Sequence, residues 1–211
     1  IAVQETEQGY AVAGGQQYHA CDLTVEGDYS QAAFFCVANA LGSDITLTNL
    51  NPESVQGDKK IVEIVREMCY NREQGLPAGF TVDAADIPDL VPILAVLATF
   101  GTAPSSITGA HRLAIKESDR LASTADLLNR LGGKVTATPD GLEIEPVEHL
   151  HGGTVDSCGD HRIAMCAAVA ATRCAGEVTI LHGECVEKSY PRFYEDYRQL
   201  GGIANVIVLE S

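Results

Sequence analysis

The chain has 211 residues, 45% of them hydrophobic and 20% charged, which is typical of a globular protein with a substantial core. Its formal net charge of −15 repels the phosphates of nucleic acids and anionic membranes, so we expect neither as a partner. The longest apolar run, residues 163–172, is too short to span a bilayer, and the start lacks the features of a signal peptide.

Cysteine usage favours a reduced, cytoplasmic setting. The seven cysteines are odd in number and no two have the Cys-x-x-Cys spacing. Cys158 with His161, or His149 with His151, are conceivable metal ligands, but the sequence has no four-ligand pattern. We therefore expect no metal.

Residues 1–23 predict a small hairpin or hinge segment. Residues 1–3 and 10–12 read as short strands on either side of a Gln8-Gly9 turn. The segment carries no reactive cluster, so we expect an edge piece. The chain also begins with Ile1 instead of Met, which suggests a piece of a longer protein.

From residue 24 onward one unit occurs three times, over residues 24–80, 81–153 and 154–208. Each unit opens with a short strand and an Asp, continues with an apolar helix and a second strand, and ends with a charged helix. The opening Asp precedes the start of the charged helix by 30, 30 and 28 residues, in the pairs Asp28 and Asp58, Asp86 and Lys116, Asp160 and Lys188. Such regular spacing indicates a repeated supersecondary unit within a domain of residues 24–211.

The pattern predicts the following elements. The apolar helices are expected at residues 31–41, 89–100 and 162–173, and the second strands at 45–49, 106–108 and 178–181. The charged helices are expected from residues 60, 116 and 192, and a hairpin with an Asp140-Gly141 turn follows the second of them.

The first helix of each unit is apolar on nearly all sides, as in residues 163–171. Such a helix must be covered all round, so we predict an α/β (α+β) fold with buried helices inside and sheets outside. Pro92 is expected to remove one backbone hydrogen bond from the second helix and to bend it.

Acidic residues stand at the start of each buried helix. Asp28, Asp86 and Asp160 are placed as N-caps. Asp89 lies one step further, inside its helix, where a cap is no longer needed. It is either a first-turn acid favoured by the helix dipole or part of a site.

A charge cluster follows the extended lead-in of residues 113–115. If the helix starts at Lys116, then Lys116 and Arg120 share one face, with Glu117 beside them. Two cations and a carboxylate suit an anionic substrate and acid–base chemistry. The alternative is a solvated first turn with paired charges.

Two further cations occupy equivalent positions. Arg162 begins a buried helix, where the dipole disfavours positive charge unless an anion binds there; the alternative is a pair with Asp156 or Asp160. Lys188 matches Lys116 by repeat, although a lone lysine is usually a surface residue. We expect Lys116, Arg120, Arg162 and Lys188 to converge at one end of the domain, with Asp89 and Glu117 among them, on a phosphate-bearing substrate.

Several motifs together resemble the 5-enolpyruvylshikimate-3-phosphate (EPSP) synthase family. They are Val25-Glu-Gly-Asp-Tyr-Ser-Gln-Ala-Ala-Phe-Phe, Ile87-Pro-Asp-Leu, Lys116-Glu-Ser-Asp-Arg120, Asp160-His-Arg-Ile-Ala-Met165 and Lys188-Ser-Tyr-Pro-Arg-Phe193. The resemblance is to the C-terminal half and covers nearly everything after residue 24. It implies two similar domains, each of three βαβαββ units, that close on substrates between them.

The resemblance also implies an activity: transfer of enolpyruvyl from phosphoenolpyruvate to the 5-hydroxyl of shikimate 3-phosphate, with release of phosphate and without a cofactor. It implies that Asp89 is the base on the 5-hydroxyl, that Glu117 gives and retrieves the methylene proton, and that Lys116 contacts the shikimate side. The implied phosphoenolpyruvate ligands are Arg120, Arg162 and Lys188, with His161 nearby. Glyphosate-type inhibitors are implied as well.

The sequence departs from the family in two respects. Arg112 stands where some members have Asn, and the family's N-terminal domain is absent, so we expect the chain alone not to turn over. Two alternatives remain: a UDP-N-acetylglucosamine enolpyruvyl transferase domain, against which Lys-Glu-Ser-Asp-Arg argues, and a non-catalytic fragment that binds anions or docks a partner domain.

Overall fold

A computed structural model describes residues 1–207. None of the helices in this range is long and apolar enough to cross a bilayer. The α-helices are α1 (Tyr29–Ala40), α2 (Lys60–Glu73), α3 (Val91–Thr99), α4 (Arg120–Arg130), α5 (His161–Ala171) and α6 (Phe193–Gln199). The strands are β1 (Val3–Thr6), β2 (Gly9–Val12), β3 (Thr81–Asp83), β4 (Ser105–Thr108), β5 (Lys134–Thr138), β6 (Gly141–Glu145), β7 (Leu150–Asp156) and β8 (Cys174–Leu181).

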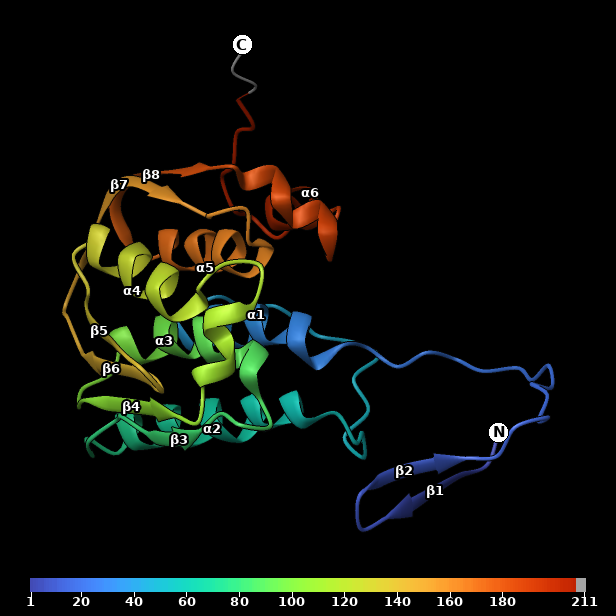
Figure 1. The fold of residues 1–211 in the computed structure, drawn as a ribbon. Coiled ribbons are helices and arrows are strands. Elements are labelled where there is room, and N and C mark those ends of the chain that lie inside the picture. The colour runs from blue at the N-terminus through green and yellow to red at the C-terminus, as the bar shows by residue number, and fades with distance from the viewer. Residues whose placement is uncertain (208–211) are drawn as a thin grey trace.

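Helices α1, α3 and α5 lie in the middle of the body, with the sheets and the other helices around them (Figure 1). Every residue of α3 is buried, as are the first ten residues of α5. Apart from Thr99 in α3 and His161 and Arg162 at the start of α5, these buried side chains are apolar, so burial on every side removes the most hydrocarbon from water. The predicted α/β arrangement of inner helices and outer sheets is therefore confirmed.

The three units share a layout but differ in completeness. The second unit forms a four-stranded sheet in the order β3-β4-β6-β5, in which β3 and β4 are parallel and the β5–β6 hairpin is antiparallel. The third unit pairs β7 with β8 in parallel. Within the described part of the chain, only the second unit has the full βαβαββ pattern. Position 208, the predicted end of the third unit, and the domain end at 211 lie outside the described residues.

The strand predicted at residues 45–49 does not form, and neither does the short strand that opens the first unit. The two segments do lie side by side, because Gly27 N donates to Asn49 O at 2.7 Å and Asn49 Nδ2 donates to Val25 O at 3.1 Å. Asn49 has a φ of 61°, which ends the extended conformation. One backbone hydrogen bond joins the two segments, and no strand ladder forms between them.

The start of the charged helix also differs from the prediction. The lead-in expected to be extended is a 3₁₀ turn, η3 (His111–Ile115), and α4 begins at Arg120 behind Asp119, whose carboxylate accepts from Ala122 N. Lys116 thus lies outside the helix and shares no helical face with Arg120. The prediction for Pro92 was wrong as well: α3 begins at Val91, so Pro92 sits in the first turn, where no helical hydrogen bond is lost.

Two of the three predicted N-caps form. Asp28 accepts from Ser30 N and Asp160 accepts from Arg162 N. Asp86 does not cap, because a 3₁₀ turn, η2 (Pro88–Leu90), intervenes before α3, and the N-cap positions of these two elements are Ile87 and Leu90. The inserted turn places the N-cap of α3 at Leu90, four residues past the expected cap.

The caps predict a contrast between two aspartates. We expect Asp28→Ala to lower the free energy of unfolding by about 1 kcal/mol, because it leaves a helix N–H without its acceptor. We expect Asp86→Ala to change it by less than about 0.5 kcal/mol, since Asp86 is exposed. Urea unfolding of both variants measures the difference; equal losses would contradict the assigned caps.

The first residues stand apart from the body. Strands β1 and β2 pair in antiparallel fashion from Val3 opposite Val12 to Thr6 opposite Gly9, so the turn falls at Glu7 and Gln8, one residue earlier than predicted. The hairpin projects away from the helices and is exposed throughout (Figure 1).

Candidate active site

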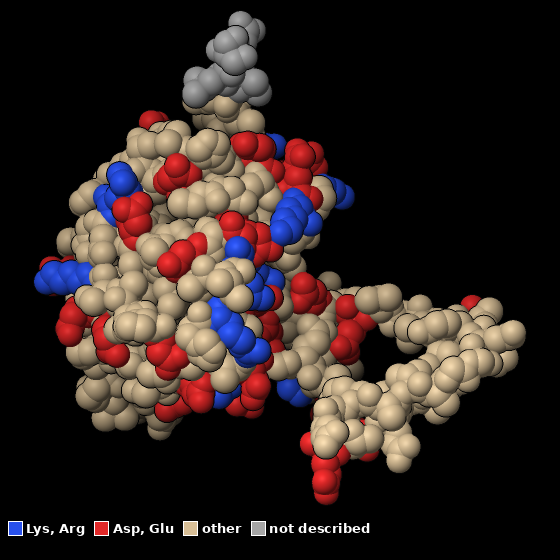
Figure 2. Space-filling view, in the orientation of Figure 1, with Lys and Arg blue, Asp and Glu red and all other residues tan. Residues whose placement is uncertain are grey.

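Charged side chains from the second and third units gather near the N-terminal ends of α3 and α5. Figure 2 shows acidic and basic atoms side by side on the face turned toward the N-terminal hairpin. The structure brings together six of the seven site residues predicted from the sequence through direct contacts: Asp89, Lys116, Glu117, Arg120, Arg162 and Lys188.

Arg120 lies at the centre of this cluster and is only 1% exposed. Its guanidinium donates to three carboxylates: Nε to Asp160 Oδ2 at 2.7 Å, Nη1 to Asp89 Oδ1 at 2.8 Å and Nη2 to Glu117 Oε2 at 2.6 Å. Burial opposes its charge, but these carboxylates outweigh burial and raise the pKa of Arg120. Arg120 is therefore a permanent cation that connects the second and third units.

Asp160 has a second role that the sequence did not predict. It is fully buried, and besides capping α5 it accepts from Arg120 Nε and from Ser118 Oγ at 3.2 Å. A buried carboxylate needs such partners, because its charge would otherwise lose its hydration without compensation. Asp160 thus fixes Arg120 against the N-terminus of α5.

Asp89 sits in η2 and faces three cations. Its Oδ1 accepts from Arg120 and lies 3.8 Å from Lys116 Nζ, and its Oδ2 accepts from Arg162 Nη2 at 3.0 Å. The segment before it is held by Arg112, whose Nη2 donates to the carbonyl of Ala85. Asp89 is thus a carboxylate surrounded by positive charge, directly before the N-terminal end of the apolar helix α3.

Glu117 is held by Lys188 from the third unit. Lys188 Nζ donates to Glu117 Oε1, while Arg120 holds the other oxygen. The bond from Lys188 is the main reason that the pKa of Glu117 falls to about 2, with burial acting in the opposite sense. Glu117 is therefore ionised in this arrangement.

We expect a titration to show this coupling. The side-chain ¹³C signal of Glu117 should titrate with a midpoint near pH 2 in the chain, and Lys188→Met should move the midpoint toward the ordinary value of 4.5. The pKa is lowered on folding, so the stability from Glu117 is present above pH 4.5 and is lost as the pH falls toward 2. An unchanged midpoint in Lys188→Met would contradict the pairing.

Arg162 has spare hydrogen-bonding capacity. It is 7% exposed, and its Nε and Nη1 are buried without a partner among residues 1–207. Its side chain pairs with Asp89, and not with Asp156 or Asp160 as the alternative reading proposed. Buried N–H groups left unpaired are costly, so a guanidinium with two of them is suited to receive an anion.

His161 is the seventh predicted residue and lies next to this group. It is buried, and its Nδ1 has no hydrogen-bond partner within the described range. Burial, and then the charge of Arg162, lower the pKa of His161, so the ring is neutral near pH 7. Residues 1–207 contain no group of three or more His, Cys, Asp or Glu side chains that could hold a metal ion.

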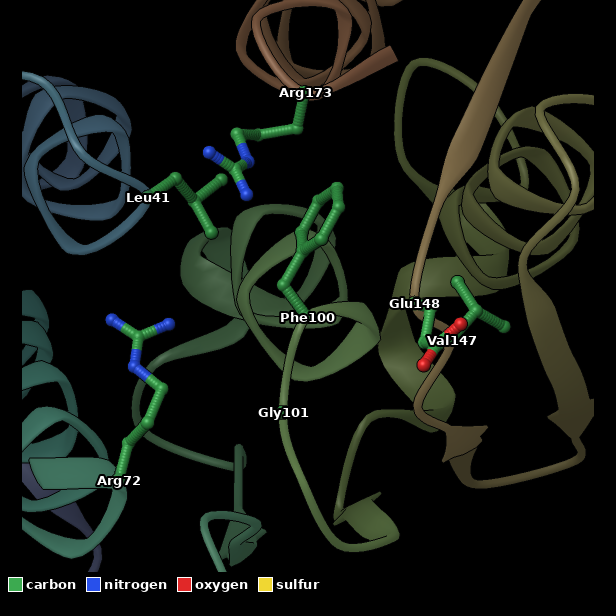
Figure 3. Close-up of a pocket in the computed structure, with 7 residues that line it drawn as sticks. All are labelled: Leu41, Arg72, Phe100, Gly101, Val147, Glu148 and Arg173. Atoms are coloured by element: carbon green, nitrogen blue, oxygen red, sulfur yellow. The ribbon is translucent and has the colours of Figure 1, made fainter. Parts of the chain in front are cut away.

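The hollow of about 200 Å³ drawn in Figure 3 lies at the opposite ends of the inner helices. It is lined by Leu41 and Phe100, the C-caps of α1 and α3, and by Arg173 beyond α5. Arg72 Nη2 donates to the carbonyl of Ala40 at 2.7 Å. Cations here complement helix C-termini, which explains them without a ligand.

Comparisons with known proteins identify the family of the chain. The family model of EPSP synthase (3-phosphoshikimate 1-carboxyvinyltransferase) matches residues 1–197. Similar proteins include the 3-phosphoshikimate 1-carboxyvinyltransferases of Clostridium acetobutylicum, 45% identical over 202 residues, and of Clostridium perfringens, 44% identical over 204 residues. Each alignment covers 92% of this chain but only 47% and 48% of the relative.

A solved structure of EPSP synthase from Acinetobacter baumannii is similar with a TM-score of 0.79 and 28% identity. The alignment covers 95% of this chain and 52% of that protein. The chain therefore spans about half the length of the curated relatives and solved structures that it matches.

Proposed function

Because the chain belongs to the EPSP synthase (3-phosphoshikimate 1-carboxyvinyltransferase) family, we propose that it forms the C-terminal half of such an enzyme. The complete enzyme would transfer enolpyruvyl from phosphoenolpyruvate to the 5-hydroxyl of shikimate 3-phosphate and release phosphate, a step of chorismate and aromatic amino acid biosynthesis. The proposal rests on one observation: two carboxylates and four cations contact one another near the N-terminal ends of α3 and α5. They are Asp89, Glu117, Lys116, Arg120, Arg162 and Lys188.

The reaction requires proton transfer at oxygen and at carbon. Asp89 would take the proton of the 5-hydroxyl as its oxygen bonds to C2 of phosphoenolpyruvate, and Glu117 would protonate C3. Glu117 would then retrieve a proton from C3 as the bond from C2 to the phosphate oxygen breaks. Lys116, 3.8 Å from Asp89, would contact the shikimate side.

The cations would hold the carboxylate and phosphate of phosphoenolpyruvate. Arg162 is best prepared for this role, because two of its N–H groups have no partner within residues 1–207. All three sides of the Arg120 guanidinium are occupied by protein carboxylates. Arg120 can therefore reach an anion only if Asp89 or Glu117 gives way.

Lys188 couples substrate binding to the acidity of Glu117. With Lys188 bonded to it, Glu117 has a pKa of about 2 and cannot donate a proton near pH 7. An incoming phosphate or carboxylate would draw Lys188 away and remove the main cause of that low pKa. Anion binding would thus prepare Glu117 to act as the acid.

The isolated chain holds one wall of the site, so we expect it not to turn over. The test is phosphate release from both substrates by the chain alone and after addition of the N-terminal half of the Clostridium acetobutylicum relative. We expect activity only in the mixture, and inhibition of it by glyphosate-type compounds. Phosphate release by the chain alone would contradict the proposal that it holds only half of the site. An inactive mixture would favour a non-catalytic fragment. Use of a nucleotide sugar as the acceptor would favour a UDP-N-acetylglucosamine enolpyruvyl transferase.

We place the enzyme in the cytoplasm. All seven cysteines are free thiols in the structure, which suits a reducing compartment. The charge of −15 argues against nucleic acid and anionic membranes as partners, and the missing N-terminal half is the partner that the site requires.

A further inference from the structure

Two residues of the proposed chemistry, Lys116 and Glu117, lie on an irregular segment. Residues 116–119 join the 3₁₀ turn η3 to α4 and belong to no helix or strand. Among residues 1–207, no other backbone group bonds to the main chain of Glu117 or Ser118. The position of Glu117 on this segment therefore depends on bonds made by side chains.

The hydroxyl of Ser118 anchors the segment to α5. It donates to Asp160 Oδ2 at 3.2 Å, and Asp160 is fully buried at the N-cap of α5. The same carboxylate oxygen accepts from Arg120 Nε at 2.7 Å. Ser118, the residue directly after Glu117, is thus bonded to the carboxylate that also orients Arg120.

A second hydroxyl supports Ser118 from inside α4. Ser123 Oγ lies 2.7 Å from Ser118 Oγ, and Ser123 is only 6% exposed. An ionised carboxylate can only accept, so Ser118 gives its proton to Asp160 and accepts one from Ser123. Ser123 Oγ can also donate to the carbonyl of Asp119 at 2.5 Å. The two hydroxyls thus connect the end of the segment with both α4 and α5.

Glu117 needs this anchor when substrate binds. Its carboxylate is held by Arg120 and Lys188, and in the proposed mechanism Lys188 leaves it for the incoming anion. The reach of Glu117 toward a substrate carbon then depends on where its backbone lies. We propose that Ser118, supported by Ser123, is a positioning residue that fixes the backbone of Glu117 for proton transfer. Its part in proton transfer rests on the proposed function.

Amide ¹⁵N relaxation of the 211-residue chain tests the anchor without substrate. We expect an order parameter of about 0.85 for Glu117, the value of rigid backbone, and a fall to about 0.6 in Ser118→Ala. Ser118→Thr keeps the hydroxyl and should keep the rigid value. Ser106→Ala is the matched control, because Ser106 Oγ also donates to a carboxylate, Glu143 Oε1 at 2.8 Å, between β4 and β6. It should leave Glu117 rigid.

An unchanged order parameter of Glu117 in Ser118→Ala would overturn the proposal, and so would an equal loss of order in Ser118→Thr. If Ser118→Ala does not fold, Ser118→Cys replaces it, because a thiol is only a weak hydrogen-bond donor. The Glu117 amide must then lose order in Ser118→Cys, or the proposal fails.

The complemented enzyme gives a second test. Ser118→Ala should lower kcat by about tenfold, because the acid is misplaced but still present, and leave KM for phosphoenolpyruvate within about twofold. Ser118→Thr should restore kcat. A raised KM with an unchanged kcat would contradict the positioning role. An inactive wild-type mixture would refute the enzymatic function, whereas the relaxation result judges Ser118 on its own.

Discussion

Arg120→Leu is expected to destabilise the chain by about 3–5 kcal/mol, because it removes the cation shared by three carboxylates and leaves buried charge uncompensated. The largest part of this loss of stability is expected from Asp160, because its carboxylate is fully buried and water cannot replace the lost cation. Urea unfolding followed by circular dichroism measures the loss.

Arg130→Leu is the matched control for this experiment. Arg130 also pairs with a carboxylate, Asp126, at 2.6 Å, but both side chains are at least half exposed. Its loss should cost less than about 1 kcal/mol. If the Arg120 and Arg130 variants lost similar stability, the buried network would not hold the second and third units together as described.

Glu117→Gln is expected to lower kcat of the complemented enzyme by about 10²–10⁴-fold, the range typical of losing a general acid or base. The amide keeps the size of the side chain and can still bond to Arg120 or Lys188, so folding and substrate binding should be preserved. Steady-state phosphate release at saturating substrates gives kcat, and unfolding curves show whether the variant is folded.

Glu63→Gln is its control, because Glu63 is an exposed residue of α2 outside the charged cluster. It should leave kcat within about twofold. A Glu117→Gln enzyme with nearly full kcat would remove Glu117 from the proposed chemistry, and the site would then need another acid.

The inner helices could be predicted from the sequence because their signal is local. Residues 163–171 are apolar at every position, and only burial on all sides accommodates such a helix. The nearly equal spacing of the units also predicts Lys116 and Lys188 at one end of the domain, where they meet Asp89 and Glu117. Roles assigned to these residues remain proposals that the experiments above address.

The errors arose where neighbouring segments decide the local structure. The composition of residues 45–49 predicts a strand. It does not show that the neighbouring segment, residues 25–27, forms only one backbone hydrogen bond with it. The charges of residues 116–120 suit a first helical turn and predict a helix start at Lys116, but Asp119 is the cap and α4 begins at Arg120.

The sequence also does not reveal which residues the buried polar groups bond to. Asp160 reads as a simple cap in the sequence, and its bond to Arg120 joins residues 40 positions apart.

The most direct test of the account is the fate of solvent hydrogen in the transferred group. If Glu117 protonates C3 of phosphoenolpyruvate and then removes a proton from the resulting methyl group, the complemented enzyme run in D₂O must place deuterium in the methylene of its product. Mass spectrometry of the product measures this. We predict deuterium in the enolpyruvyl methylene with the wild-type chain; product formed at full rate without deuterium would contradict the addition–elimination chemistry assigned to this site.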